Sequence, residues 1–300
     1  MPAQRTLRHA TPCTGIGLHS GQKVSIVLKP APANTGIRFK RTDLNVEVPA
    51  TTACLGGPQQ LQTGLRLGEA SIETVEHLLS ALSSLGVDNA VIELNQPEVP
   101  IMDGSASPWV YLIQSTGTKE LGAPRQTIEI LSPIEVQDGD KRIAAFPADR
   151  FKLTYTISFD HPLLRHQEKT LDITEQVYVD EIAPARTFGF LKDVELMRQR
   201  GLALGGSLDN AIVIGETGVL NQLRFDDEFV RHKMLDVIGD LALIGHPICG
   251  HVVVQRGGHA LHTKFATELL RQRDAWRLVD ASEPTAAPVA ARVPARASAR

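Results

Sequence analysis

Apolar residues recur at helical spacing in two well-separated stretches of the chain. In the first stretch, Ser71 stands where a helix N-cap is expected and Gly86 stands where the helix should end. The apolar positions between them are Val75, Leu78, Leu79, Leu82 and Leu85. The second stretch runs from about Asp226 to Ile244, and a shorter helix is predicted to begin near Ser107. The pattern therefore predicts two long helices and one short helix.

Apolar and β-branched runs bounded by turn residues predict the strands. In the first half of the chain they lie at 24–28, 37–41 and 87–94. In the second half they lie at 126–134, 141–147, 151–159 and 251–255. Residues 117–124 are the best candidate for a linker between the halves. Each half combines several strands with one long helix, which indicates an α+β fold.

A short repeat relates the two long helices. Val75-Glu76-His77-Leu78-Leu79 aligns with Val230-Arg231-His232-Lys233-Met234, and each is followed by a leucine-rich stretch, a glycine and an apolar strand. We therefore predict two related α+β domains, residues 1–122 and 125–280, each with a histidine on its main helix. The apolar, glycine-rich segment from about 190 to 214 does not fit the repeat and is predicted to be an insertion. Residues 283–300, which are rich in Ala, Pro and Arg, are predicted to be a disordered tail.

The composition narrows the class of protein. The 300 residues carry a net charge of −3, from 31 basic and 34 acidic residues. Binding to nucleic acid requires a clustered basic excess, so no nucleic-acid partner is expected. Apolar runs stay well below the roughly 20 residues that span a bilayer, so no stable membrane insertion is expected either. The first residues lack the apolar core of a signal peptide, and the three separated cysteines do not form a cysteine-rich zinc module. We expect a cytoplasmic protein.

A histidine and a carboxylate lie one turn apart on the second long helix. His232 and Asp236 are four residues apart, which places their side chains on one helix face, and Asp240 continues that face by another turn. An imidazole and a carboxylate at this spacing can bind one metal ion. The alternative is a solvated surface pair that binds no metal, and this motif alone favours that alternative.

Two further motifs bear on hydrolytic chemistry. In the first long helix, His77 can bind a metal while the adjacent Glu76 reaches a water molecule as general base. The alternative is a surface glutamate beside a half-buried histidine. His259 follows Gly257-Gly258, and a histidine in such a turn can donate a proton or stabilise an oxyanion. Its alternative is a histidine that only occupies the turn.

Five segments carry a wider resemblance, and they follow one another in the same order as in a known family. They are Ser71-Ile72-Glu73-Thr74-Val75-Glu76-His77-Leu78, Pro97-Glu98-Val99-Pro100-Ile101-Met102-Asp103-Gly104-Ser105, Ala185-Arg186-Thr187-Phe188-Gly189, Phe229-Val230-Arg231-His232-Lys233-Met234-Leu235-Asp236 with Gly239-Asp240, and Gly258-His259-Ala260-Leu261. Together they resemble the zinc-dependent UDP-3-O-acyl-N-acetylglucosamine deacetylases of bacterial lipid A synthesis. The resemblance covers about nine-tenths of the chain, from near residue 5 to about residue 275.

The resemblance implies the fold and the residues of the site. The two α+β domains would each be a sheet with helices packed on one face, with the helices sandwiched between the two sheets and the site at the domain junction. His77, His232 and Asp236 would bind one Zn²⁺ per chain, with Fe²⁺ as the alternative metal in the cell. The implied catalytic residues are Glu76 as general base, His259 as the catalytic histidine, Asp240 as the carboxylate that orients it, and Thr187 as the donor to the tetrahedral oxyanion.

The resemblance also implies the substrate and the reaction. The N-acetyl group of UDP-3-O-acyl-N-acetylglucosamine would be hydrolysed to acetate and UDP-3-O-acyl-glucosamine, the committed step of lipid A biosynthesis. Lys233 and Arg256 are expected near the phosphates, although a lysine is usual at position 256 and the two cations differ in geometry. Phe188 belongs to the same substrate-binding set, and Leu202 and Leu208 are expected to line an acyl-chain channel in the insertion. The protein is expected to be a monomer, and the role of the loop between Cys54 and Ser71 stays open.

Three other functions compete with this interpretation. One is a zinc amidohydrolase that acts on a different acylated amino sugar. Another is a non-catalytic sugar-nucleotide binder with a structural metal, which would have no need for Glu76, Thr187 and His259 together. The third is a metal-free protein in which His232 and Asp236 are a surface pair.

Overall fold

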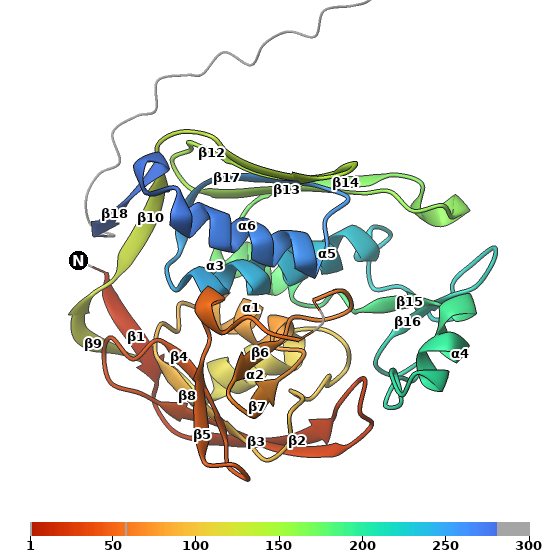
Figure 1. Cartoon of the computed structure of the whole chain (residues 1–300), viewed down its shortest axis with the longest axis horizontal. Coiled ribbons are helices and arrows are strands. Elements are labelled where there is room, and N and C mark those ends of the chain that lie inside the picture. The colour runs from red at the N-terminus through yellow and green to blue at the C-terminus, as the bar shows by residue number, and fades with distance from the viewer. Residues whose placement is uncertain (1, 58, 281–300) are drawn as a thin grey trace, which may run out of the picture.

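Two β-sheets enclose a layer of helices in the computed structural model, which describes residues 2–57 and 59–280 (Figure 1). The predicted α+β fold, with helices sandwiched between two sheets, is therefore confirmed. The predicted tail at 283–300 lies outside the described residues, and the domain boundaries at 122 and 125 stay a prediction. In the described part of the chain, no helix is long and apolar enough to cross a membrane.

The N-terminal layer is a five-stranded sheet with the order β2-β3-β8-β4-β5. Its strands are β2 (Thr11–Ile16), β3 (Lys23–Pro30), β4 (Ile37–Arg41), β5 (Val46–Pro49) and β8 (Ala90–Leu94). Helices α1 (Glu76–Ser84) and α2 (Ser107–Thr116) lie on its inner side (Figure 1). In β8, Ala90, Ile92 and Leu94 are buried while the residues between them are more exposed, which is the alternation expected of a strand with one face in the core.

The C-terminal layer is a seven-stranded sheet with β17 at its centre. β17 pairs in parallel with β10 and β13 and antiparallel with β12. The strands are β10 (Gln126–Ile130), β11 (Ile134–Asp138), β12 (Lys141–Phe146), β13 (Phe151–Ile157), β14 (Gln167–Asp172), β17 (Ile248–Gln255) and β18 (Trp276–Asp280). Helices α5 (Glu228–Leu241) and α6 (His259–Arg271) cover its inner face, so they lie against the helices of the first layer (Figure 1).

Three small sheets complete the structure. They pair β1 (Ala3–Leu7) with β9 (Thr118–Pro124), β6 (Leu65–Leu67) with β7 (Ala70–Ile72), and β15 (Phe188–Phe190) with β16 (Ile212–Ile214). Helix α4 (Leu191–Gln199) connects β15 to β16, and this segment projects from the body of the molecule (Figure 1). Short helical turns lie at Thr52–Cys54, Pro162–Leu164, α3 (Glu175–Val177), Tyr178–Ile182, Ala242–Ile244 and Arg273–Ala275.

The predicted start of the first long helix is wrong. Ser71 is not an N-cap but lies in β7, where it pairs with Arg66 of β6. The chain stays extended beyond β7 because Glu73 exchanges backbone hydrogen bonds with the segment around Pro97. Thr74 then adopts a φ of 57°, and the helix begins at Glu76. Pairing with β6 and with the segment around Pro97 thus overrides the capping signal of Ser71.

Other boundaries agree more closely with the sequence. Gly86 ends α1 with a φ of 67°, and the backbone N–H of Val87 donates to the carbonyl of Leu82, as in a glycine C-cap. The predicted helix at 226–244 corresponds to α5 and the turn that follows it. The predicted linker at 117–124 instead forms β9, which is held by β1, and the predicted strand 126–134 is divided into β10 and β11 around Pro133.

Candidate active site

Helices α1 and α5 approach each other closely enough to join their polar residues into one buried cluster. A β-carbon at Gly239 of α5 would lie 2.0 Å from the backbone oxygen of Glu76 in α1, so only glycine permits this approach. The contact brings Glu76 and His77 beside the inward face of α5, which carries His232, Asp236 and Asp240. All of these side chains are buried.

Three of the predicted residues converge as a potential metal site. The ligand atoms of His77, His232 and Asp236 all lie within 4.8 Å of one another. Asp236 Oδ1 lies 3.6 Å from His77 Nε2 and 3.3 Å from His232 Nε2. The spacing of four residues pointed to the pair on α5, and the family resemblance implied His77 as the third ligand. The fold brings His77 from the other layer to this pair.

The hydrogen bonds around this group leave its donor atoms free for a cation. His232 Nδ1 lies 3.1 Å from the carbonyl oxygen of Ala185, so the ring proton sits on Nδ1 and the Nε2 lone pair faces the cluster. Asp236 Oδ1 is buried without a hydrogen-bond partner, whereas Oδ2 accepts from Lys233 Nζ at 2.7 Å. An unpartnered buried carboxylate oxygen facing two imidazole nitrogens fits a divalent metal ion.

His232 and Asp236 have the protonation states that metal ligands require. Burial lowers the pKa of His232 to about 3, so its imidazole is neutral at pH 7. Burial opposes ionisation of Asp236, but the attraction of His232 in its protonated form, of Lys233 and of His259 outweighs it and holds the pKa of Asp236 well below its ordinary value. A neutral imidazole and an ionised carboxylate are the metal-binding forms of these side chains.

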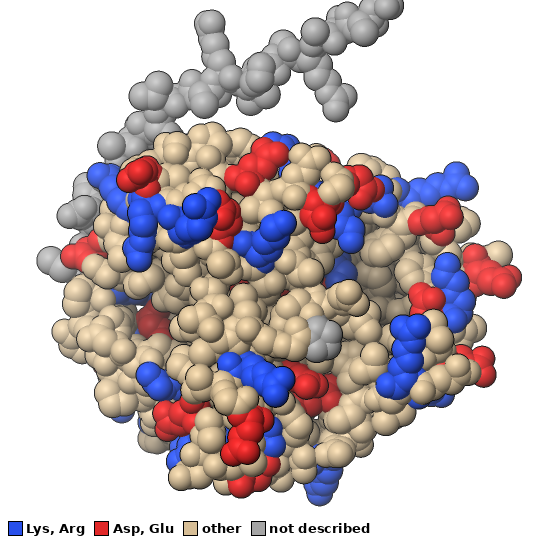
Figure 2. Space-filling view, in the orientation of Figure 1, with Lys and Arg blue, Asp and Glu red and all other residues tan. Residues whose placement is uncertain are grey.

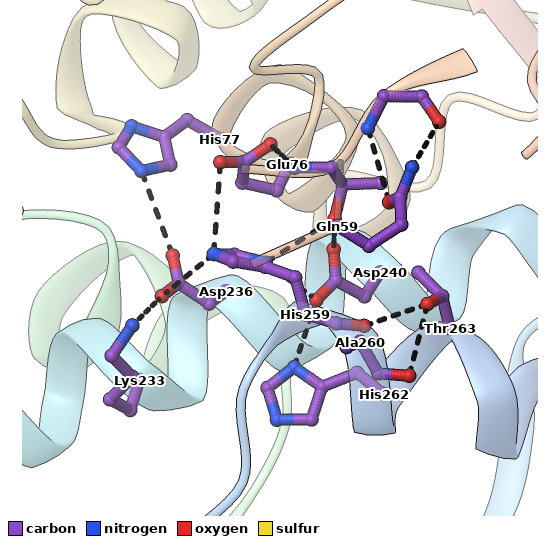
Figure 3. A network of polar contacts seen from close by, with 12 residues as sticks. Gln59, Glu76, His77, Lys233, Asp236, Asp240, His259, Ala260, His262 and Thr263 are labelled. Atoms are coloured by element: carbon purple, nitrogen blue, oxygen red, sulfur yellow. Dashed lines mark hydrogen bonds and ion pairs between the residues drawn. The ribbon is translucent and has the colours of Figure 1, made fainter. Parts of the chain in front are cut away.

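Glu76 and His259 lie beside this group of potential ligands (Figure 3). Glu76 Oε1 is 3.9 Å from His259 Nε2, and Asp236 Oδ2 is 3.8 Å from the same nitrogen. Burial raises the pKa of Glu76, in spite of attraction from His259 and His77. Burial alone would lower the pKa of His259, but Asp240, Glu76 and Asp236 together raise it to about 9. The site therefore holds a carboxylate suited to accept a proton and an imidazolium suited to donate one.

Asp240 lies within hydrogen-bond distance of His259, the histidine that the family resemblance implies it orients. Asp240 Oδ2 lies 2.9 Å from His259 Nδ1 and 2.8 Å from Nδ1 of His262. These distances are those of hydrogen bonds, so Asp240, His259 and His262 form a hydrogen-bonded network.

A cavity of about 670 Å³ opens next to the cluster, between the body of the molecule and the projecting segment around α4. Figure 2 shows the surface hollowed there, and it shows charges of both signs interspersed over this face. The cavity wall includes five predicted residues, namely Thr187, Phe188, Leu202, Leu208 and Lys233. Phe188 packs against Phe229 and His232, and Lys233 joins the cavity to the cluster through its bond to Asp236.

Arg256 lies elsewhere. Its guanidinium pairs with Asp140 at 2.5 Å, its side chain is 48% exposed, and it is not part of the cavity wall. A contact of Arg256 with substrate phosphates therefore stays a prediction.

Sequence reasoning missed three residues of the network. Thr63, in the loop between Cys54 and Ser71, donates its hydroxyl to Asp240 Oδ1 at 2.5 Å and its backbone N–H to Glu76 Oε2 at 3.0 Å. His262 and Tyr155 extend the network behind Asp240. Position 262 is one helical turn beyond His259, which was an available signal, but nothing in the spacing indicates Thr63 or Tyr155.

The chain is similar to one family over most of its length. Residues 4–271 match the family model described as UDP-3-O-acyl N-acetylglycosamine deacetylase. A UDP-3-O-acyl-N-acetylglucosamine deacetylase of Pseudomonas entomophila (strain L48) is 49% identical over 295 residues, which cover 96% of this chain and 97% of the relative. A protein of the same name from Saccharophagus degradans is 48% identical over 295 residues, with the same coverage.

Proposed function

The chain belongs to the UDP-3-O-acyl N-acetylglycosamine deacetylase family, and on that premise we propose that it hydrolyses the N-acetyl group of UDP-3-O-acyl-N-acetylglucosamine. The products are acetate and UDP-3-O-acyl-glucosamine, and the reaction is a step of lipid A biosynthesis. The observation that carries this proposal is the meeting of a free metal-ligand triad with a buried carboxylate and a buried imidazole at the junction of the two layers.

His77, His232 and Asp236 would hold the metal ion, for which we propose Zn²⁺. When bound there, the metal would polarise the acetamide carbonyl and lower the pKa of a water molecule. Two imidazoles and one carboxylate are a common catalytic zinc set, and they also suit Fe²⁺. Metal analysis of the purified protein distinguishes the two.

Glu76 accepts a proton in the reaction, and His259 donates one. As the water oxygen forms a bond to the carbonyl carbon, Glu76 accepts the proton that the water loses. When the tetrahedral adduct collapses, the carbon–nitrogen bond breaks and the leaving nitrogen takes a proton from His259. An amine leaves poorly without that proton, which is why the site needs an acid as well as a base.

Thr187 is proposed to donate its hydroxyl to the developing oxyanion. It lies at the wall of the cavity just before β15, next to Phe188. One such donor contributes about 3 kcal/mol to stabilisation of the transition state.

The cavity is proposed to hold the acyl chain. Its wall is largely aliphatic and aromatic, with Leu202 and Leu208 contributed by the projecting segment and Lys233 at the polar end. An apolar channel that ends at a cation and a metal site suits a substrate with a fatty chain at one end and phosphates at the other. Arg256 is the second proposed phosphate contact. A monomeric state and a cytoplasmic location remain predictions from the sequence.

The test is acetate release from UDP-3-O-acyl-N-acetylglucosamine by metal-stripped protein, before and after addition of one equivalent of Zn²⁺. Turnover restored by zinc is the expected result. Stoichiometric zinc binding without turnover would favour a different acylated sugar or a non-catalytic binder, and absence of zinc binding would contradict the ligand assignment.

A matched pair of variants sharpens the test. His232→Ala should abolish both zinc binding and turnover. His251→Ala is the control, because His251 lies on the opposite face of β17 from buried Val252 and hydrogen-bonds Thr154 at 2.9 Å.

A further inference from the structure

A buried chain of hydrogen bonds continues behind His259, beyond the residues that the reaction uses directly. Tyr155 Oη on β13 lies 3.0 Å from Nε2 of His262 on α6, and His262 Nδ1 lies 2.8 Å from Asp240 Oδ2. Tyr155 and His262 are both fully buried. Neither lines the substrate cavity, so neither is placed to touch the substrate.

The direction of each hydrogen bond follows from the protonation states. An ionised carboxylate can only accept, so His262 must donate its Nδ1 proton to Asp240. Burial lowers the pKa of His262, which leaves its Nε2 unprotonated and able to accept. Burial, with smaller contributions from Asp236 and Asp240, raises the pKa of Tyr155 well above its ordinary value, so the tyrosine keeps its proton and donates it to His262. The chain therefore runs from Tyr155 through His262 to Asp240.

Asp240 is fixed by this chain at the point where it meets His259. Its Oδ2 accepts from both imidazoles, at 2.8 Å and 2.9 Å, and its Oδ1 accepts from Thr63. The carboxylate thus has donors on both oxygens and no freedom to rotate without breaking one of them. Without His262, Oδ2 would keep only the bond to His259, and the carboxylate would be held by one donor on each oxygen.

The backbone at Gly257 leaves room for the Tyr155–His262 pair. A β-carbon at Gly257 would lie 2.6 Å from His262 Nε2 and 2.9 Å from the Tyr155 hydroxyl. Only glycine at this position leaves room for the hydrogen bond between these two side chains. The segment that carries His259 into α6 therefore packs directly on the Tyr155–His262 pair.

We propose that His262, held by Tyr155, is a positioning residue for the deacetylation. It fixes the carboxylate of Asp240 and through it the direction in which the His259 imidazole faces Glu76 and the scissile amide. The inference rests on the proposed function, since it assigns His262 a part in that reaction. His262 affects the chemical step and not substrate binding.

The experiment compares four variants of the zinc-loaded full chain, with kcat and KM measured separately by acetate release. His262→Leu removes the donor to Asp240. His262→Asn restores it, because the asparagine side-chain nitrogen occupies nearly the position of histidine Nδ1. Tyr155→Phe removes only the hydroxyl that fixes the histidine. Tyr178→Phe is the matched control, because Tyr178 is the other fully buried tyrosine and takes no part in this network.

The expected pattern is a loss confined to kcat. By analogy with outer-shell partners of metal ligands, His262→Leu should lower kcat about 10- to 100-fold with KM changed less than about twofold. His262→Asn should recover most of that loss, Tyr155→Phe should lower kcat about threefold to tenfold, and Tyr178→Phe should match the wild type. If His262→Leu does not fold, the double variant Tyr155→Phe/His262→Leu replaces it, because it leaves no buried tyrosine hydroxyl without a partner.

The outcomes distinguish a failure of the positioning role from a failure of the proposed function. Wild-type protein that releases no acetate would contradict the proposed function, and the positioning role would fall with it. Active wild type together with an unchanged kcat in His262→Leu would overturn the positioning role alone. A kcat in His262→Asn as low as in His262→Leu, with both losses following the loss of thermal stability, would show that His262 only supports the core.

Discussion

The backbone oxygen of Glu76 lies only 2.0 Å from where a β-carbon of residue 239 would stand, so Gly239 sets the distance between the two helices that build the site. Glu76 begins α1, and Gly239 lies one turn beyond Asp236 on α5. The same contact therefore determines how near the general base and His77 come to the ligands on α5. The contact between Gly239 and Glu76 therefore determines both how closely the two helices pack and how far apart their site residues lie.

Gly239→Ala should damage both stability and metal binding. The added methyl group must push α1 away from α5, which costs about 1–3 kcal/mol of the free energy of unfolding and moves His77 out of reach of the metal. Zinc affinity, measured by competition with a chelator, should fall together with the unfolding temperature. Gly122→Ala on exposed β9 meets no atom within 4 Å and is the control. An unchanged zinc affinity in Gly239→Ala would contradict this account of the helix contact.

Glu76→Gln should remove turnover and keep the metal. The amide has nearly the shape of the carboxylate but cannot accept the proton from water, so kcat should fall about 10²- to 10⁴-fold. Glu76 is not one of the converging ligands, so zinc content should remain one per chain. Turnover close to wild type in this variant would rule out Glu76 as the general base.

The pH dependence of kcat should be bell-shaped, since Glu76 must be ionised and His259 protonated. Burial raises the pKa of Glu76 and nearby carboxylates raise the pKa of His259, so activity is lost as the pH falls through the first and as it rises through the second. A bound cation lowers the pKa of Glu76 and that of His259. The decisive measurement therefore compares the pH profile of a variant with that of the wild type. Asp240→Asn removes the largest attraction on the His259 imidazolium and should move the basic limb to lower pH. A basic limb that stays in place would argue against His259 as its source.

Leu202→Ala and Leu208→Ala should change which acyl chain is preferred. Each substitution widens the cavity, and burial of two further methylene groups is worth about 1.6 kcal/mol, or roughly a tenfold gain in kcat/KM for a longer chain. The measurement is the ratio of kcat/KM for substrates that differ by two carbons. Leu131→Ala is the control, because Leu131 is 48% exposed and lies outside the cavity wall. An unchanged ratio in both cavity variants would place the acyl chain elsewhere.

The bounds of helix α5 could be predicted closely because they follow from residues that are near one another in the sequence. Its apolar repeat and the spacing of His232 and Asp236 depend on residues three and four apart, which are neighbours in any helix. The start of α1 could not be predicted, because Ser71 pairs with Arg66 in a small sheet that competes with the helix. A capping signal worth about 1 kcal/mol yields to the backbone hydrogen bonds of this hairpin and of Glu73 with the segment around Pro97.

The sequence by itself determined the α+β class, the two long helices, the pair of potential ligands on α5 and, through the order of its motifs, the family. Through the same resemblance the sequence also assigned His77 to that ligand set, and the structure brings the three side chains together. Only the tertiary structure decided that Thr63 and His262 hold Asp240 and that Arg256 pairs with Asp140 away from the cavity. Thr63 and Asp240 are 177 residues apart, and no periodicity in the chain records such a contact. Spacing along a helix fixes which side chains share a face, whereas the meeting of two faces depends on how closely α1 and α5 pack.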